Sequence, residues 1–207
     1  MAGNKMGEQT REKILNAALL EFVEKGFDEA RVEDVAKRAG LTKVMLYYHF
    51  SSKENLMIEL MARLSTEITE KFRENLSDLD IRNPQSVRDH AEGMLDYLSG
   101  REEVIRLMIS ESIKGKNGHI GSLSIFEEFF KAVSSIPSKD SDKNSDRDKT
   151  YHNQLLVRIF FFNMLPMAIY SGLSNQFNND FGIDARESRK VFVDTFINVL
   201  HQNIAEE

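Results

Sequence analysis

The sequence predicts an all-α protein built from two helical domains. Through most of the 207 residues, apolar side chains recur at intervals of three and four positions, which is the spacing of amphipathic helices. Short segments rich in Gly, Asn, Ser and Pro separate these stretches. Within residues 31–53, two of the helical segments are short and are joined by a tight turn. We therefore expect an N-terminal three-helix domain of the helix-turn-helix type at residues 1–53, followed by a helical domain at residues 54–207.

The two short helices are defined by their apolar spacing and by the residues between them. The first, Val32 to Ala39, turns an apolar stripe to one side. Gly40 follows it, where a helix end favours a residue that tolerates a left-handed conformation. Thr42 is expected to cap the second helix, Lys43 to Phe50, with its side-chain oxygen.

The second short helix exposes an unusual set of side chains. Helical geometry directs Leu46 and Phe50 toward a core and turns Val44 and Tyr48 away from it. The exposed side also carries Lys43, Met45, Tyr47 and His49. Apolar tips beside hydroxyls and cations suit a DNA major groove, where they can meet thymine methyls, phosphates and base edges. A solvated face of a helical bundle is the alternative, because this motif also occurs in proteins that never bind DNA.

A wider pattern resembles one protein family. The stretches ILNAALLEFVEKGF, VEDVAKRAGLTKVMLYYHF and SSKENL follow one another between Thr10 and Leu56. Their order and spacing are similar to the TetR family of bacterial transcriptional regulators, over about a quarter of the chain. The resemblance implies a homodimer that binds a palindromic double-stranded DNA operator, with a C-terminal helical domain for ligand binding and dimerisation.

The resemblance also implies which residues contact DNA. The residues that align with family contact positions are Thr42, Lys43, Val44, Tyr47, Tyr48, His49 and Lys53. Arg31 stands where many relatives carry a threonine near phosphate, and we include it in the predicted contact set. Val44 replaces a common small residue, so the base preference of relatives cannot be carried over.

The rest of the chain is expected to form a series of helices. Thr10 is a plausible cap for a first helix, Arg11 to Lys25. An unbroken helix runs from Lys53 to about Leu76, because no Gly or Pro interrupts its apolar stripe. The further predicted helices span residues 84–98, 101–112, about 123–136, 151–177 and 184–204.

The last two helices are apolar on more than one side, so each requires cover on two faces. This predicts a homodimer through a four-helix interface that includes Phe160, Phe192, Phe196 and Leu200, which is also the family arrangement. A deeper monomeric core is the alternative.

Methionine and phenylalanine residues of the second domain predict a cavity for a small, largely apolar ligand, because methionine adapts to irregular space. The candidates are Met61, Leu64, Met94, Met108, Phe126, Phe129, Phe130, Met164 and Met167. Pro166 is expected to kink its helix beside the cavity. Ordinary core packing accounts for the same residues, which leaves an architectural or cell-division DNA-binding dimer without an effector as the alternative function.

Composition limits the other function classes. The net charge is −6, but residues 1–53 carry nine Lys or Arg and eight Asp or Glu, so the acidity belongs to the second domain. The chain has no cysteine, and its five histidines lack metal-ligand spacing, so we expect no cofactor, no metal site and no catalytic residues. The N-terminus has no apolar signal-peptide core, and the apolar run Ile159 to Tyr170 is too short to span a bilayer. We therefore expect a cytoplasmic protein.

Overall fold

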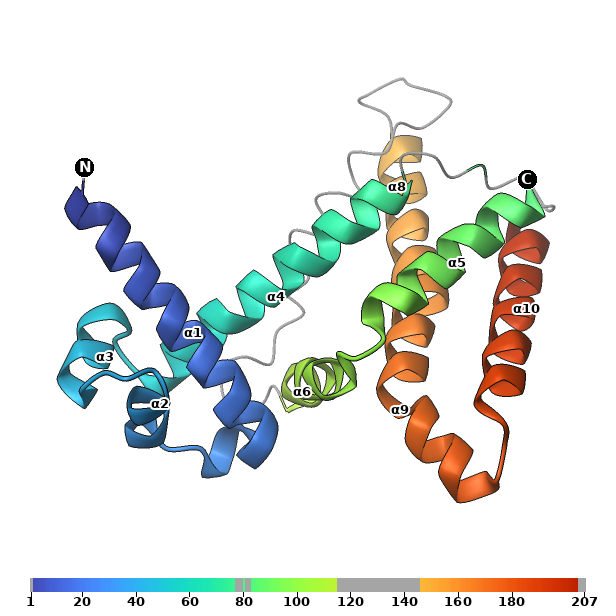
Figure 1. Ribbon diagram of the computed structural model, residues 1–207. Coiled ribbons are helices and arrows are strands. Elements are labelled where there is room, and N and C mark those ends of the chain that lie inside the picture. Colours follow the sequence, from blue (N-terminus) through green and yellow to red (C-terminus); the bar gives the residue numbers. More distant parts are fainter. Residues whose placement is uncertain (1, 77–79, 81–82, 115–145, 205–207) are drawn as a thin grey trace. The chain divides into compact units, whose positions relative to one another are not determined.

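The computed structural model describes residues 2–76, 80, 83–114 and 146–204 (Figure 1). These residues form helices and connecting turns and no strand, which confirms the all-α prediction. The elements are α1 (Ala2–Glu29), α2 (Val32–Arg38), α3 (Lys43–His49), α4 (Lys53–Leu76), α5 (Pro84–Leu98), α6 (Glu102–Ile113), α8 (Asp146–Ile159), the π-helix η2 (Phe160–Met164), α9 (Leu165–Phe181) and α10 (Ala185–Ile204).

Contacts divide the described residues into two units. The first contains residues 2–65 and 106–114, and the second contains residues 66–105 and 146–204. Two helices, α4 and α6, therefore contribute to both units. Packing explains why the first unit continues past residue 53, since Leu56, Met57, Leu60 and Met61 of α4 are all 0% exposed. The boundary after residue 53 stays a prediction.

The first helix begins earlier than its sequence indicates. Instead of capping a helix at Arg11, Thr10 lies inside α1 and its Oγ1 donates a hydrogen bond to the Met6 carbonyl oxygen at 2.9 Å. The predicted Thr10 cap was wrong, because a threonine hydroxyl within a helix can bond back to the carbonyl four residues earlier. Gly26 interrupts the helix with φ of 76°, a conformation that favours glycine.

The first unit is held together by apolar side chains from all of its helices. Phe22 of α1, Val35 of α2 and Leu46 of α3 are each no more than 1% exposed, and Phe50 after α3 is fully buried. Burial of one such side chain stabilises a fold by about 1.5–3 kcal/mol. This shared core fixes the orientation of α3, and therefore the set of α3 side chains that faces outward.

In the second unit, one continuous helical segment runs from Asp146 to Phe181 through α8, η2 and α9. Pro166 does not end it, and the five residues Phe160–Met164 adopt π geometry just before the proline. The N–H of Leu165 donates to the Phe160 carbonyl, five residues earlier. Because Pro166 has no N–H to offer the carbonyl four residues earlier, wider π turns let the chain pass it without leaving the helix.

The segment Leu156–Phe181 is also long and apolar enough to cross a membrane, by length and composition alone. The sequence-based expectation that the run from Ile159 to Tyr170 is too short considered only part of this helix. One such helix is weak evidence for a membrane span, because a helix that packs against other helices passes the same test.

Candidate nucleic-acid interface

The turn between α2 and α3 has the geometry that its sequence predicts. Gly40 adopts φ of 70°, and the N–H of Leu41 donates to the Ala36 carbonyl at 2.9 Å. The N–H of Met45 donates to Thr42 Oγ1 at 3.2 Å, so Thr42 caps α3 as expected. The two helices are thereby locked in a fixed relation, and α3 leaves the turn with a defined rotation about its own axis.

This rotation separates a buried side of α3 from an exposed side. Leu46 and the following Phe50 are 0% exposed, whereas Val44 is 79% and Tyr48 is 86% exposed. Tyr47 is also exposed, and His49 is half-buried with its ring 5.3 Å from the Tyr48 ring. Exposed aliphatic and aromatic side chains on one short helix are costly in water, and they are suited to contact with base edges in a groove.

Lys43 is held at the start of α3 by an ion pair. Its Nζ lies 2.5 Å from Glu33 Oε1 and 5.7 Å from the centre of the Tyr47 ring. The hydrogen bond from Lys43 holds the pKa of Glu33 below its ordinary value, and the same bond raises the pKa of Lys43. A phosphate that approaches Lys43 must therefore compete with Glu33.

Arg31 is exposed at the N-cap position of α2 and makes no side-chain cap.

Lys53 has a structural role that the sequence did not indicate. Its Nζ donates to the Ala30 carbonyl at 2.8 Å and to the Asp28 carbonyl at 3.2 Å, and it lies 4.4 Å from the centre of the Phe27 ring. Two of the three ammonium N–H groups thus bind the last turn of α1 and the residue that follows this helix.

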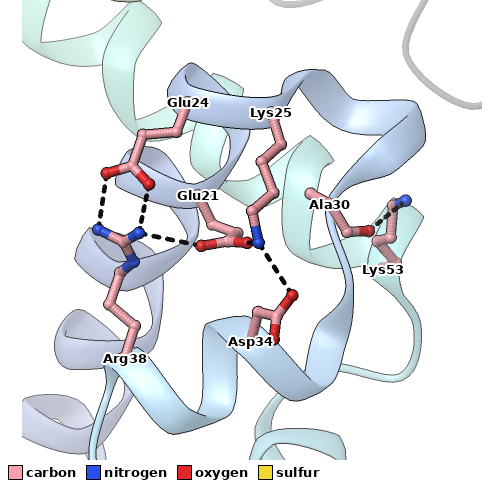
Figure 2. Close-up of polar contacts among 7 residues, drawn as sticks. All are labelled: Glu21, Glu24, Lys25, Ala30, Asp34, Arg38 and Lys53. Atoms are coloured by element: carbon pink, nitrogen blue, oxygen red, sulfur yellow. Dashed lines mark hydrogen bonds and ion pairs between the residues drawn. The ribbon is translucent and has the colours of Figure 1, made fainter.

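A cluster of ion pairs joins α1 to α2 (Figure 2). The Glu21 carboxylate, 2% exposed, pairs with Lys25 and lies 3.1 Å from Arg38 Nη2. Lys25 also bonds Asp34 at 3.0 Å, and Arg38 binds Glu24 through both Nη atoms. Hydrogen bonding to Glu21 raises the pKa of Lys25, and hydrogen bonding to Lys25 lowers the pKa of Asp34.

Sequence reasoning missed this cluster, although a signal was present. Glu21 lies three and seven positions after the buried Ala18 and Ile14, on the core side of α1. An acid at such a position requires a cationic partner inside the fold, because a buried charge without one is strongly destabilising.

The predicted ligand-binding residues are mostly interior. Met61, Leu64, Met94, Met108 and Met167 are buried and Met164 is half-buried, whereas Phe126, Phe129 and Phe130 lie outside the described residues. Met61, Leu64 and Met108 belong to the first unit, and Met94, Met164 and Met167 to the second. The described part of the chain has a groove between α9 and α10 and a cavity beside α5, and none of these predicted residues lines either one. The predicted apolar cavity remains a prediction.

The predicted dimer-interface residues that the structure describes are mostly covered within the single chain. Phe160 and Phe196 are 7% and 5% exposed within the single chain, and Phe192 is half-buried. Leu200 lies in α10, outside the residues whose side chains are described. The exposed apolar residues on α9 and α10 are instead Ile169, Leu173, Phe177, Phe181, Val191 and Val199. Several of them line a groove of about 830 Å³ between α9 and α10.

Comparison with known proteins identifies relatives of this chain. Residues 14–60 match the family model of bacterial regulatory proteins, tetR family. The HTH-type transcriptional repressor NicS of Pseudomonas putida is 28% identical over 109 residues, which cover 51% of this chain and 50% of NicS. The HTH-type transcriptional activator FasR of Mycolicibacterium smegmatis is 31% identical over 111 residues, which cover 51% of this chain and 50% of FasR. The chain thus spans about half the length of these relatives, and both are named as transcriptional regulators rather than enzymes.

The whole fold also has a counterpart among solved structures. The transcriptional regulator FadR from Bacillus subtilis, solved in complex with stearoyl-CoA, superimposes with a TM-score of 0.61 at 15% identity. The superposition covers 91% of this chain and 96% of FadR. At this identity the likeness establishes a common fold, with an N-terminal helix-turn-helix and a C-terminal helical domain.

Proposed function

We propose that the chain, whose residues 14–60 match the family model of bacterial regulatory proteins of the tetR family, is a transcriptional repressor of the ligand-released type. In this proposal a homodimer binds a palindromic double-stranded DNA operator and leaves it when a small, largely apolar ligand binds. The observation that carries the DNA-binding part is the outward face of α3, where Val44 and Tyr48 are 79% and 86% exposed on a helix whose opposite side is fully buried.

Each residue of the α3 region has a distinct proposed role on DNA. Val44 and Tyr48 face the base edges, with Tyr47 and His49 beside them. The proposed phosphate contacts are Arg31, Thr42, Lys43 and Lys53, which lie at or just before the starts of α2, α3 and α4. Cations and helix N-termini near phosphates position a protein on the duplex but do not read its sequence.

Dimerisation is proposed to occur through α9 and α10. Leu173 and Phe177 on α9 and Val191 on α10 are 43–59% exposed and lie along one apolar groove. Contiguous apolar surface of this kind typically marks contact with another protein. Two copies of α3 would then enter successive major grooves, about 34 Å apart.

The proposed release mechanism uses the two helices that contribute to both units. A displacement of α4 by ligand would move the region immediately after α3. A displacement of α6 would act on the segment before α2, because Lys114 Nζ lies 3.3 Å from Asp28 Oδ2 while the Asp28 carbonyl binds Lys53. A ligand shifts the DNA-bound population only if it binds one arrangement better than the other, with typical coupling of about 1–3 kcal/mol.

The first experiment selects operator sequences from genomic fragments with the full-length protein and measures their affinity at several salt concentrations. We expect one preferred palindrome, and we expect Val44→Ala to change the preference among single-base variants. Lys190→Ala, an exposed lysine of α10, is the matched control and should leave the preference unchanged. Binding without any sequence preference would refute the proposal and favour the architectural alternative.

The effector is tested separately, with stearoyl-CoA as the first probe because FadR was solved with it. We expect the probe to weaken operator binding about 5- to 150-fold. In Lys114→Ala the probe should still bind, but with a smaller effect on the operator. If the probe binds free and DNA-bound protein equally well, ligand release is excluded for this molecule, and the effector-free alternative gains support.

A further inference from the structure

The second unit contains a polar cavity that the proposed function does not use. It lies among α5, α6, α9 and α10 and measures about 220 Å³. The lining side chains that matter for its chemistry are Ser99, Glu102, Tyr170, Ser171, Asn178 and Arg189. Since a water molecule occupies about 30 Å³ in the liquid, this space matches roughly seven waters or one small organic molecule.

Two buried polar atoms in this cavity have no hydrogen-bond partner among the described residues. They are Oδ1 of Asn178 and Oγ of Ser171, and both residues are only 7% exposed. Buried polar groups in native proteins are nearly always bonded, and an unpartnered one is destabilising. Asn178 Oδ1 is solely an acceptor, so its missing partner is a hydrogen-bond donor.

Two charged side chains line the cavity, Arg189 and Glu102, and only Arg189 has an oppositely charged partner among the described residues. Arg189 Nη2 donates to Asp96 Oδ1 at 2.6 Å and to the Glu92 carbonyl at 3.2 Å, so its positive charge has a partner. Glu102 accepts only neutral donors within the described residues, the N–H of Gly100 at 3.2 Å and Asn175 Nδ2 at 3.5 Å. The cavity therefore offers an acceptor and a carboxylate that has no cationic partner among the described residues.

We propose that this cavity binds a small molecule that carries a protonated amino group. The ammonium donates to Asn178 Oδ1 and pairs with the Glu102 carboxylate, while the Ser171 hydroxyl binds a second polar atom of the ligand. Charge-assisted hydrogen bonds of this kind are stronger than neutral ones, and the burial of Asn178 limits the screening of its bond by solvent. The proposal does not depend on DNA binding, and the site is separate from the predicted apolar effector residues.

The test uses the full chain without DNA and three probes of equal length: 1,4-diaminobutane, the neutral 1,4-butanediol and the dianion succinate. Binding is measured by calorimetry and by the shift of the thermal midpoint, which rises when a ligand binds only the folded state. We expect the diamine to raise the midpoint and the diol and succinate to have little effect. An equal shift with all three probes, or none with the diamine, would overturn the proposal.

Variants locate the binding. Glu102→Gln keeps the shape of the side chain and should weaken diamine binding at least about tenfold, whereas Glu103→Gln, an exposed neighbour, should not change it. Asn178→Leu should abolish the diamine shift and raise the midpoint of the free protein, because it removes an unpartnered buried group. Asn178→Asp should tighten diamine binding, which gives a gain of affinity that a folding defect cannot mimic. Diamine binding that survives both Glu102→Gln and Asn178→Leu would reflect only the acidity of the chain and would refute the site.

Discussion

Apolar side chains are exposed both on α3 and in the groove between α9 and α10, and these two surfaces differ in what surrounds those side chains. On α3, Val44 and Tyr48 stand beside Lys43 and Thr42, and the surface belongs to a single helix of seven residues. Between α9 and α10, Leu173, Phe177 and Val191 line a groove of about 830 Å³.

The difference indicates the kind of partner. A polyanion with methyl groups in its groove requires cations and hydroxyls interleaved with apolar tips, which is the composition of α3. A second protein surface requires continuous apolar area, which the groove between α9 and α10 provides. Exposed apolar area alone therefore does not identify a partner, and the polar residues next to it carry the information.

The largest expected effect separates core from interface. Phe196→Glu places a charge where the single chain is 5% exposed, so we expect it to lower the free energy of unfolding by more than the ~3–5 kcal/mol typical of phenylalanine truncation. Chemical denaturation followed by circular dichroism measures this. A stable, folded monomer would show instead that Phe196 belongs to the dimer interface, as the sequence predicts.

The next effect concerns the groove. Phe177→Glu combined with Val191→Glu should leave the fold intact and produce monomers, because both side chains are about half-exposed in the single chain. Sedimentation velocity reports the association state, and operator affinity should fall by about 100-fold or more as simultaneous binding of two half-sites is lost. Asn179→Glu adds one charge to an exposed position of α9 and should preserve the dimer.

Substitution on α3 is expected to have a smaller effect on operator binding. Val44→Ala should change the ranking of operator variants by about 1–3 kcal/mol per affected base pair and leave dimerisation unaltered.

Lys53→Ala should weaken binding to all sequences alike, and it should also lower the thermal midpoint because two carbonyls lose their donor. An unchanged thermal midpoint for Lys53→Ala would contradict the structural role of this lysine.

The smallest effect concerns pH. The pKa of Asp34 is lowered by its hydrogen bond to Lys25, so its contribution to stability is present above the ordinary carboxyl pKa and is lost as pH falls through the lowered value. Asp34→Asn should therefore reduce the acid-side decline of the thermal midpoint, measured from about pH 6 down to about pH 3. Glu29→Gln, an exposed acid of α1, is the control, and an equal reduction for both variants would rule out the specific pair.

Sequence reasoning succeeded for most local determinants, with the Thr10 cap as an exception. Gly40, Thr42 and Pro84 act within one turn of the helix ends that they define, so these ends could be placed from the sequence. The bounds of α4 and α5 also follow directly from caps and apolar spacing.

Reasoning failed where the determinants are tertiary. Lys53 binds carbonyls more than twenty residues away, and Glu21 meets Arg38 across two helices, so neither contact has a local signature. Apolar spacing likewise cannot tell whether Phe160 is covered by its own chain or by a partner, because both faces of its helix are apolar.

The π-helix before Pro166 determines the direction in which the side chains of α9 point around the helix axis. A π turn accommodates one extra residue, which corresponds to a rotation of about 100° relative to an uninterrupted α-helix. In straight α geometry Ile169 would lie about 80° around the axis from Phe161; with one residue absorbed, the two lie within about 20°. The exposed apolar side chains Val157 of α8 and Phe161 of the π-helix thus lie on one stripe with Ile169, Leu173 and Phe177 of α9. Inserting or deleting one residue within the π-helix would therefore rotate α9 by about 100° relative to α8. The part of the apolar stripe on α9 would then point in another direction from the part on α8.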